Sequence, residues 1–183
     1  MRTLKPDREA RFRALYADAY GDVLRFAQRR VHPSHAEDVT ADAFLVVWRR
    51  LDDAPTRADD LRAWLFGIAR HCLLNARRGQ GRRDALAVRV AERVPSAGLA
   101  DGLDADLVAQ RMDLAAAWRQ LSETDQEALS LTVFEDLTSP QAGRVLGITP
   151  ASYRLRLLRA RRALRRQLDL AESSSYPQME TQS

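Results

Sequence analysis

The sequence predicts an all-α protein built from two small helical domains. Apolar residues recur at helical spacing along nearly the whole chain, and no stretch alternates as a strand does. A stretch rich in glycine, with Gly79, Gly81, Gly98 and Gly102, separates two such regions. The 183 residues are enough for one or two domains. We therefore expect a first domain over 7–83, a flexible linker over 84–103, a second domain over 104–170 and a disordered tail over 171–183.

The first two helices are delimited by a proline and a capping pattern. The first is expected over 7–31 and ends before Pro33, because proline restricts the preceding residue and cannot continue the hydrogen-bond ladder. Ser34, followed three residues later by Glu37, is typical of a capping box and predicts that the second helix begins there.

The remaining connections follow the same logic. The third helix is expected to begin at a cap formed by Asp59 or Asp60 and to end near Gly79. After the linker, apolar spacing predicts helices over 104–120 and 122–134.

The pattern near the C-terminus predicts a helix-turn-helix. Ser139 is expected to cap a helix that has Pro140 in its first turn, and Gly147 suits the left-handed residue that ends a helix. Thr149 with Pro150 then starts a new helix two residues later. A short helix, a glycine turn and a longer helix are the elements of this motif.

Charge is segregated along the chain. Residues 35–60 hold seven acids and three arginines, whereas 61–83 hold six arginines and no acid. The order repeats, with nine acids and two arginines over 101–136 and seven arginines without an acid over 147–168. Of the 29 basic residues 28 are arginine, whose planar fork binds phosphate and guanine. Two acid-free basic segments indicate two polyanion-binding surfaces, although each alone is also typical of a solvated helix face.

The second helix of a helix-turn-helix enters the major groove with its N-terminal residues. There arginine can bind guanine, and leucine can contact a thymine methyl group. Arginines further along the helix are better placed to bind phosphates. The candidate DNA-binding residues are Ser152, Arg154, Leu155, Leu158, Arg159, Arg161 and Arg162.

The third helix combines arginines with aromatic residues. Trp64 and Phe66 could stack on unpaired bases while arginines follow the backbone. His71 and Asn75 are four residues apart, so both can reach the same strand. The alternative is that Trp64 and Phe66 belong to the hydrophobic core.

Several function classes are excluded. A single cysteine, Cys72, rules out an intramolecular disulfide, and it falls on an apolar stripe expected in the core. His32 and His35 do not have the spacing of a metal site, and no nucleotide-binding or catalytic motif is present. No catalytic residue, metal or cofactor is therefore expected. With no secretory signal and no apolar run of membrane-spanning length, the expected location is the cytoplasm, without membrane insertion.

Two pairs of segments resemble a known family. Residues 36–48 and 61–70 are similar to region two of bacterial sigma factors, and the closest likeness is to the small extracytoplasmic-function (ECF) group. Residues 117–122 and 146–164 are similar to region four. The resemblance implies two helical domains that bind core RNA polymerase and promoter DNA without nucleotide hydrolysis. It also implies an anti-sigma factor as a possible class of partner.

The resemblance assigns a role to each charged segment. The acidic second helix would dock on the β′ clamp helices through Glu37, Asp38 and Asp42. The helix-turn-helix would read the duplex minus-thirty-five element, and its domain would contact the β-flap. The third helix would open the minus-ten element and hold an unpaired base through Arg62, Trp64, His71, Asn75, Arg77 and Arg78. His71 stands where asparagine is frequent in the family, and Gly143 where alanine is usual.

The alternative is a stand-alone helix-turn-helix regulator that binds duplex operator DNA. That function would leave the basic, aromatic third helix unexplained. The two hypotheses differ in whether the chain needs core polymerase to select a promoter.

Overall fold

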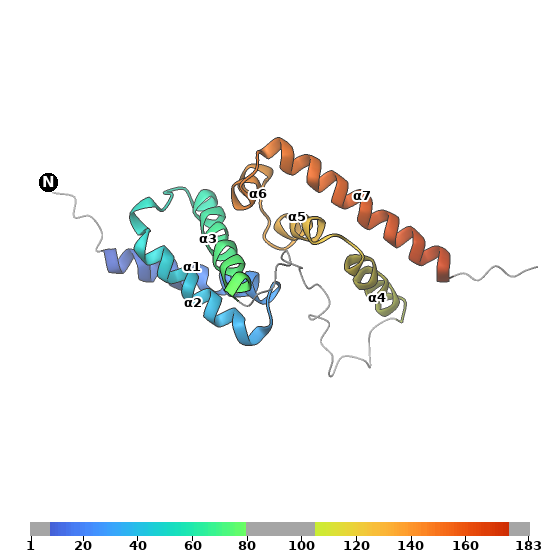
Figure 1. Cartoon of the computed structure of the whole chain (residues 1–183), viewed down its shortest axis with the longest axis horizontal. Helices are drawn as coiled ribbons and strands as arrows, with labels where there is room; N and C mark the ends of the chain where they lie inside the picture. The colour runs from blue at the N-terminus through green and yellow to red at the C-terminus, as the bar shows by residue number, and fades with distance from the viewer. Residues whose placement is uncertain (1–7, 80–104, 176–183) are drawn as a thin grey trace, which may run out of the picture.

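The computed structural model describes residues 8–79 and 105–175, with side chains over 8–76 and 107–170. Within these residues the chain is helical and has no strand, which confirms the all-α class (Figure 1). The first group of helices comprises α1 (Arg8–Gln28), α2 (Pro33–Arg49), the short 3-10 helix η1 (Leu51–Asp53) and α3 (Ala58–Gly79). The second comprises α4 (Ala105–Arg119), α5 (Glu123–Val133), α6 (Ser139–Leu146) and α7 (Pro150–Ser175). The linker expected over 84–103 lies outside the described residues.

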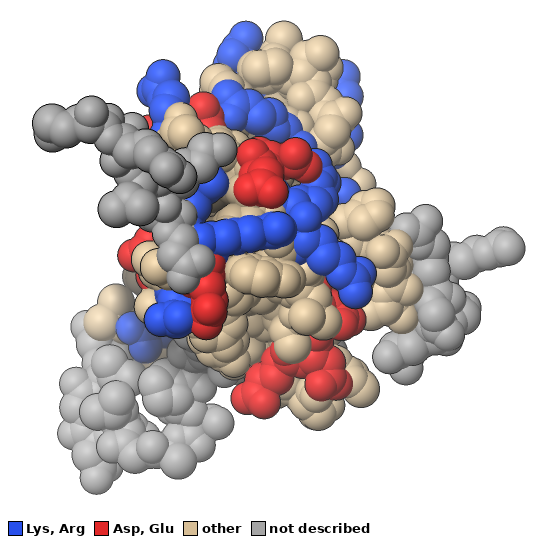
Figure 2. Space-filling view, turned by 90° about the vertical axis from the view of Figure 1, so that its left-hand side faces the viewer, with Lys and Arg blue, Asp and Glu red and all other residues tan. Residues whose placement is uncertain are grey.

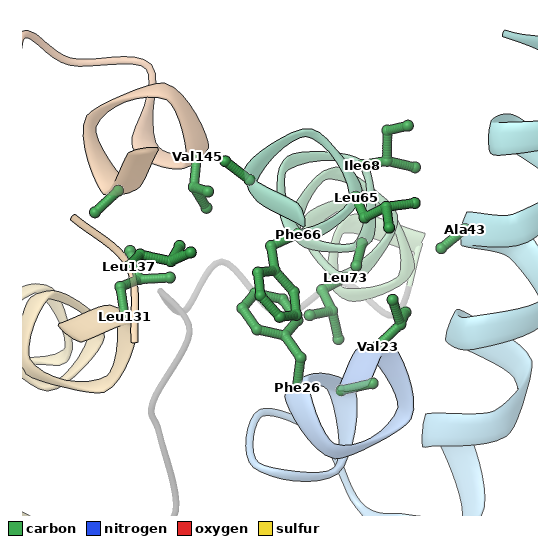
Figure 3. Packing of buried hydrophobic residues seen from close by; sticks show 14 of the residues in the cluster. Val23, Phe26, Ala43, Leu65, Phe66, Ile68, Leu73, Leu131, Leu137 and Val145 are labelled. Atoms are coloured by element: carbon green, nitrogen blue, oxygen red, sulfur yellow. The ribbon is translucent and has the colours of Figure 1, made fainter. Parts of the chain in front are cut away.

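Helix α3 forms the centre of the first group, where it packs against both α1 and α2. Phe66 of α3 stacks on Phe26 of α1 with ring centroids 4.9 Å apart, and both side chains are fully buried (Figure 3). Leu65 and Leu73 extend the buried stripe of α3. Burial of each large apolar side chain stabilises the fold by about 1.5–3 kcal/mol.

Two predicted helix starts in this group are wrong. Helix α2 begins at Pro33, and its cap is His32, whose Nδ1 accepts the backbone N–H of Ser34 at 3.4 Å. Proline is favoured at the first helical position because its missing N–H would have no partner there. Helix α3 begins at Ala58, so Asp59 and Asp60 lie in its first turn, where acidic groups favour the helix dipole.

The helix-turn-helix is present, with one correction to its start. Thr138 caps α6, and its backbone N–H donates to Oε1 of Gln141 at 2.7 Å, so Ser139 is the first helical residue and not the cap. Gly147 ends α6 in the left-handed region, with φ 68°. The hydroxyl of Thr149 accepts the N–H of Ser152 at 3.1 Å in the first turn of α7.

Tyr153 joins the helix-turn-helix to α5. Its ring is fully buried, and its hydroxyl donates to the carbonyl of Ala128 at 2.7 Å. It also lies 2.7 Å from the hydroxyl of Thr132. Burial raises the pKa of Tyr153 above its usual value. The phenol therefore stays protonated at neutral pH and keeps this bond.

Helix bounds differ from the expectation at two further places. Helix α1 ends at Gln28, before the expected Val31, which leaves Arg29 and Arg30 in the turn that follows. Helix α7 continues to Ser175, so residues 171–175 are helical although the disordered tail was predicted over 171–183. Residues 176–183 lie outside the described part of the chain.

The two groups of helices are packed against each other. Helix α3 contacts α6, and buried apolar residues of both groups form one cluster. In Figure 3, Val145 of α6 points toward α3, with Leu137 and Leu131 of the second group nearby. The sequence predicted the two groups but not this contact.

Gly143 is the position in α6 where the turn comes closest. A Cβ built on Gly143 would lie 2.8 Å from the backbone oxygen of Ile148, a distance that real Cβ atoms do not adopt. Around a Cβ built on Gly67 of α3 there is no atom within 4 Å. Glycine at position 143 thus permits the tight approach of the two helices of the motif.

Replacing Gly143 by alanine tests this requirement. We expect Gly143→Ala to lower the free energy of unfolding by about 1–3 kcal/mol, because the backbone must move to admit the methyl group. The matched control Gly67→Ala should raise it by about 0.5–1 kcal/mol through reduced backbone entropy. Urea denaturation followed by circular dichroism measures both. Equal effects of the two substitutions would contradict the steric explanation.

Candidate nucleic-acid and protein interface

An acidic surface lies on α2. Glu37, Asp38 and Asp42 are all exposed, while Val39 and Ala43 on the opposite side of the helix are buried in the core. The helix is therefore held by its apolar stripe and presents carboxylates to solvent. On the face seen in Figure 2, acidic groups lie at the lower edge, at the left side and also among the basic groups of the upper half.

An exposed aromatic cluster adjoins the same helix. Trp48 of α2 packs edge-on against Phe12 of α1, with ring centroids 5.1 Å apart. The guanidinium of Arg8 lies 4.9 Å from the Trp48 ring, and its Nη2 donates to the Trp48 carbonyl at 2.8 Å. Leu45 and Tyr16 are also exposed. The acidic surface thus has apolar side chains beside it, a combination that suits protein partners.

A cavity of about 590 Å³ lies along α3. On its α3 side it is lined by Trp64, His71 and Asn75, three of the predicted residues. Trp64 is half-buried, and His71 and Asn75 are exposed, so their polar atoms can be reached from solvent. Phe66 belongs to the core instead. Of the two aromatic residues of α3, Trp64 thus lies where it could stack on a base, whereas Phe66 belongs to the hydrophobic core.

Arg62, a further predicted residue of α3, does not line the cavity. Arg62 forms an ion pair with Asp22 at 3.4 Å, and its guanidinium lies 5.4 Å from the Phe66 ring. Arg77 and Arg78 fall in the last turn of α3, where the structure does not describe side chains.

Cys72 also lines the cavity, so its predicted place in the core is only partly correct. Burial raises the pKa of the Cys72 thiol, with a smaller contribution from Asp42. The thiolate is the reactive form, and this shift keeps the group protonated at neutral pH. Cys72 is not an activated nucleophile.

Helix α7, the second helix of the helix-turn-helix, buries one side and exposes the other. Tyr153, Leu157 and Ala160 are buried on one side. Leu155 and Leu158 remain 49% and 45% exposed, which is unusual for leucine and places apolar contacts on the surface. All seven predicted DNA-binding positions are exposed, namely Ser152, Arg154, Leu155, Leu158, Arg159, Arg161 and Arg162.

Two arginines that were not singled out lie on the cavity wall. Arg70 of α3 binds both oxygens of Glu127, at 3.0 and 3.2 Å, and Arg144 of α6 pairs with Asp60. Each pair joins the first group of helices to the second. Position 70 lies in the basic segment of the sequence, but nothing local identifies a partner 57 residues away.

Over residues 8–76 and 107–170, whose side chains the structure describes, no three His, Cys, Asp or Glu side chains gather as metal ligands would. Nδ1 of His32 lies 2.8 Å from the Ser34 hydroxyl, consistent with its capping role. Among the described helices, none has the length and apolar content that crossing a bilayer requires.

Comparison with known families accounts for both groups of helices. The model of sigma-70 region 2 matches residues 15–83, and the model of sigma-70 region 4 matches residues 111–164. The chain is 33% identical over 143 residues to the RNA polymerase sigma factor CnrH of Cupriavidus metallidurans, covering 73% of each chain. It is 29% identical over 157 residues to the ECF RNA polymerase sigma factor SigL of Mycobacterium tuberculosis, covering 85% of this chain and 88% of the relative.

Solved structures share the fold. The sigma factor RpoE of Bartonella quintana, crystallised with the anti-sigma factor NepR, superposes with a TM-score of 0.63 at 23% identity. That comparison covers 86% of this chain and 96% of the other. CnrH in complex with the cytosolic domain of CnrY gives a TM-score of 0.59 at 24% identity, with 90% and 91% covered. At this identity the likeness concerns the fold alone.

Proposed function

The chain belongs to the ECF sigma factors of the sigma-70 family, which bind core RNA polymerase and direct transcription initiation at promoters, and from this premise we propose a role for each charged helix. The observation that carries the assignment is the exposure of acidic residues on α2, of His71 and Asn75 on α3 and of basic residues on α7, all on helices whose other faces are buried.

The acidic surface of α2 docks on the β′ clamp helices of the polymerase. Glu37, Asp38 and Asp42 are exposed for contact with basic side chains, and the neighbouring Trp48 and Leu45 supply apolar area. Charge complementarity steers the encounter, and buried aromatic contact supplies affinity.

Helix α3 captures the non-template strand of the minus-ten element. Trp64 offers a ring face for stacking, while His71 and Asn75 can hydrogen-bond to a base in the adjoining cavity. Arg62, Arg77 and Arg78 would follow the phosphate backbone. Binding an unpaired base offsets the few kcal/mol that unstacking costs, so strand opening needs no hydrolysis by this chain.

Helix α7 reads the duplex minus-thirty-five element in the major groove. Arg154 and Arg159 can bind guanine edges, and Leu155 and Leu158 can contact thymine methyl groups. Arg161 and Arg162 are positioned for phosphates. The same domain contacts the β-flap of the polymerase.

The chain acts as a binding factor and not as an enzyme. It would work in the cytoplasm, where core polymerase and the chromosome are found. An anti-sigma factor is a further partner, since the solved structures of RpoE and CnrH each hold the sigma factor in complex with another protein.

Run-off transcription with purified core polymerase tests the proposal. A library of promoter fragments incubated with core enzyme and this chain should yield transcripts of defined length from a subset of fragments. Core enzyme alone should yield none. A chain that selects duplex DNA in a gel shift without polymerase, and never starts a transcript with it, would be a stand-alone regulator instead.

Reversing charge on α2 tests the docking surface. The double substitution Asp38→Lys with Asp42→Lys should weaken binding to core polymerase by roughly tenfold or more, because like charges would face each other across the interface. Asp18→Lys, an exposed acid on α1, is the control for added positive charge. Fluorescence anisotropy of the labelled chain measures both affinities. Unchanged affinity of the α2 variant, with its helicity intact, would contradict the assignment.

Alanine substitutions on α7 separate base reading from phosphate binding. Arg154→Ala should cost about 1–3 kcal/mol on the preferred upstream element and little on other sequences, if Arg154 binds guanine. Arg162→Ala should weaken binding to all sequences alike and reduce the salt dependence by about one ion. Competition binding of polymerase holoenzyme to upstream-element variants measures the difference. A uniform loss for Arg154→Ala would make it a phosphate contact.

A further inference from the structure

A cluster of charged side chains is buried between the two domains. Arg30, in the turn after α1, is 1% exposed, and its Nη1 donates to Oε1 of Glu135 at 3.3 Å. Arg29 donates to both oxygens of Glu135 at 3.2 Å. Glu127 of α5 lies 4.0 Å from Nε of Arg30. The basic groups come from the first domain and the acidic groups from the second, so this cluster is an interdomain contact.

The site around Arg30 is built on both sides. Its guanidinium lies 3.6 Å from the Phe26 ring centroid, and it donates to the Phe26 carbonyl at 3.0 Å. From the second domain, the Ser130 hydroxyl accepts from Nη2 at 3.1 Å. Arginine is almost never this buried unless its charge is paired. The closeness of these contacts indicates one defined arrangement of the domains.

The cluster holds the domains together with little net free energy. Burial lowers the pKa of Arg30 and raises the pKa of Glu135, in each case against the attraction between the two groups. Desolvation therefore offsets much of the Coulomb attraction, as in other buried ion pairs. When the domains separate, both groups regain water. The apolar contact between α3 and α6 is then the main attraction that must be overcome for the domains to separate.

Further polar contacts surround the cavity on α3. Arg70 of α3 binds Glu127 of α5, and Arg144 of α6 pairs with Asp60 of α3. Nε2 of Gln141 donates to the carbonyl of Asp59 at 3.1 Å. In this arrangement residues 144–147 of α6 form the wall opposite Trp64, His71 and Asn75.

We propose that the Arg29, Arg30, Glu127 and Glu135 cluster is a latch that keeps the free sigma factor closed, with α6 facing the strand-binding side of α3 across the cavity. In the closed form Glu127 occupies Arg70 as a phosphate would, so the interdomain contact and the DNA backbone compete for the same guanidinium. Core polymerase, which must bind the two domains at separate places, opens the latch. This inference rests on the proposed role of α3 in strand capture.

The latch is tested with Glu135→Gln in the full chain. The amide keeps the size of the side chain but leaves Arg29 and Arg30 without their shared counter-charge. Small-angle X-ray scattering should show a larger radius of gyration, and a fluorescent single-stranded 30-mer of random sequence should bind roughly tenfold tighter, because the binding-competent fraction rises. The matched control is Asp136→Asn, the exposed neighbour with φ 50°, a conformation that asparagine tolerates. The control should behave as the wild type.

A second variant is expected to act in the opposite direction. Arg29→Met and Arg30→Met combined with Glu135→Met replace all three charged groups that meet at Glu135 by apolar groups, which removes the desolvation cost and strengthens closure. We expect a radius of gyration no larger than that of the wild type and weaker binding of the 30-mer. This variant keeps the test decisive if Glu135→Gln fails to fold.

These experiments distinguish failure of the latch proposal from failure of the proposed function. If Glu135→Gln is folded but has wild-type scattering and wild-type affinity for the 30-mer, the latch is refuted. If the triple methionine variant binds the 30-mer more tightly than the wild type, the latch is refuted as well. Failure of run-off transcription with the wild-type chain would instead refute the proposed function, whatever the scattering shows.

Discussion

The structure depends on helix α3, which must pack on three neighbours at once. It packs on α1 and α2 through the stripe that contains Leu65, Phe66 and Leu73, and on α6 through an adjoining face. An α-helix has only enough circumference for a limited number of such faces. The residues left over, including His71 and Asn75, lie at the rim of the contact with α6. These two candidate strand-binding residues are therefore next to the domain interface.

Local rules were sufficient for most of the fold. The helix-turn-helix could be predicted because its signals are short-range: Gly147 has a left-handed backbone, and Thr149 caps the helix that follows. Helix starts were less certain, since several residues within one turn can serve as the cap. Thr138 took this role in place of Ser139 because Gln141 reaches back to its N–H. Periodicity identifies a helix but does not choose among adjacent caps.

Contacts between distant parts of the chain could not be predicted. Arginine is normally exposed, and no local pattern marks Arg30 as buried or Glu135 as its partner 105 residues later. Exposed positions, in contrast, were predictable: an amphipathic helix that buries Tyr153 and Leu157 must expose Arg154 and Leu158. Sequence reasoning thus located the candidate surfaces on α2 and α7. It did not anticipate that α6 forms the wall opposite the face of α3.

The use of arginine on α7 has a consequence for how this protein can be controlled. A guanidinium keeps its proton at every pH a cell experiences, and it is not a substrate for the acetylation that neutralises lysine. With 28 arginines and a single lysine, the chain offers almost no ammonium group to modify. Its attraction for nucleic acid is in effect permanent. Control over such a factor must act on the access to its DNA-binding surfaces or on the amount of the protein, through shielding, sequestration or turnover.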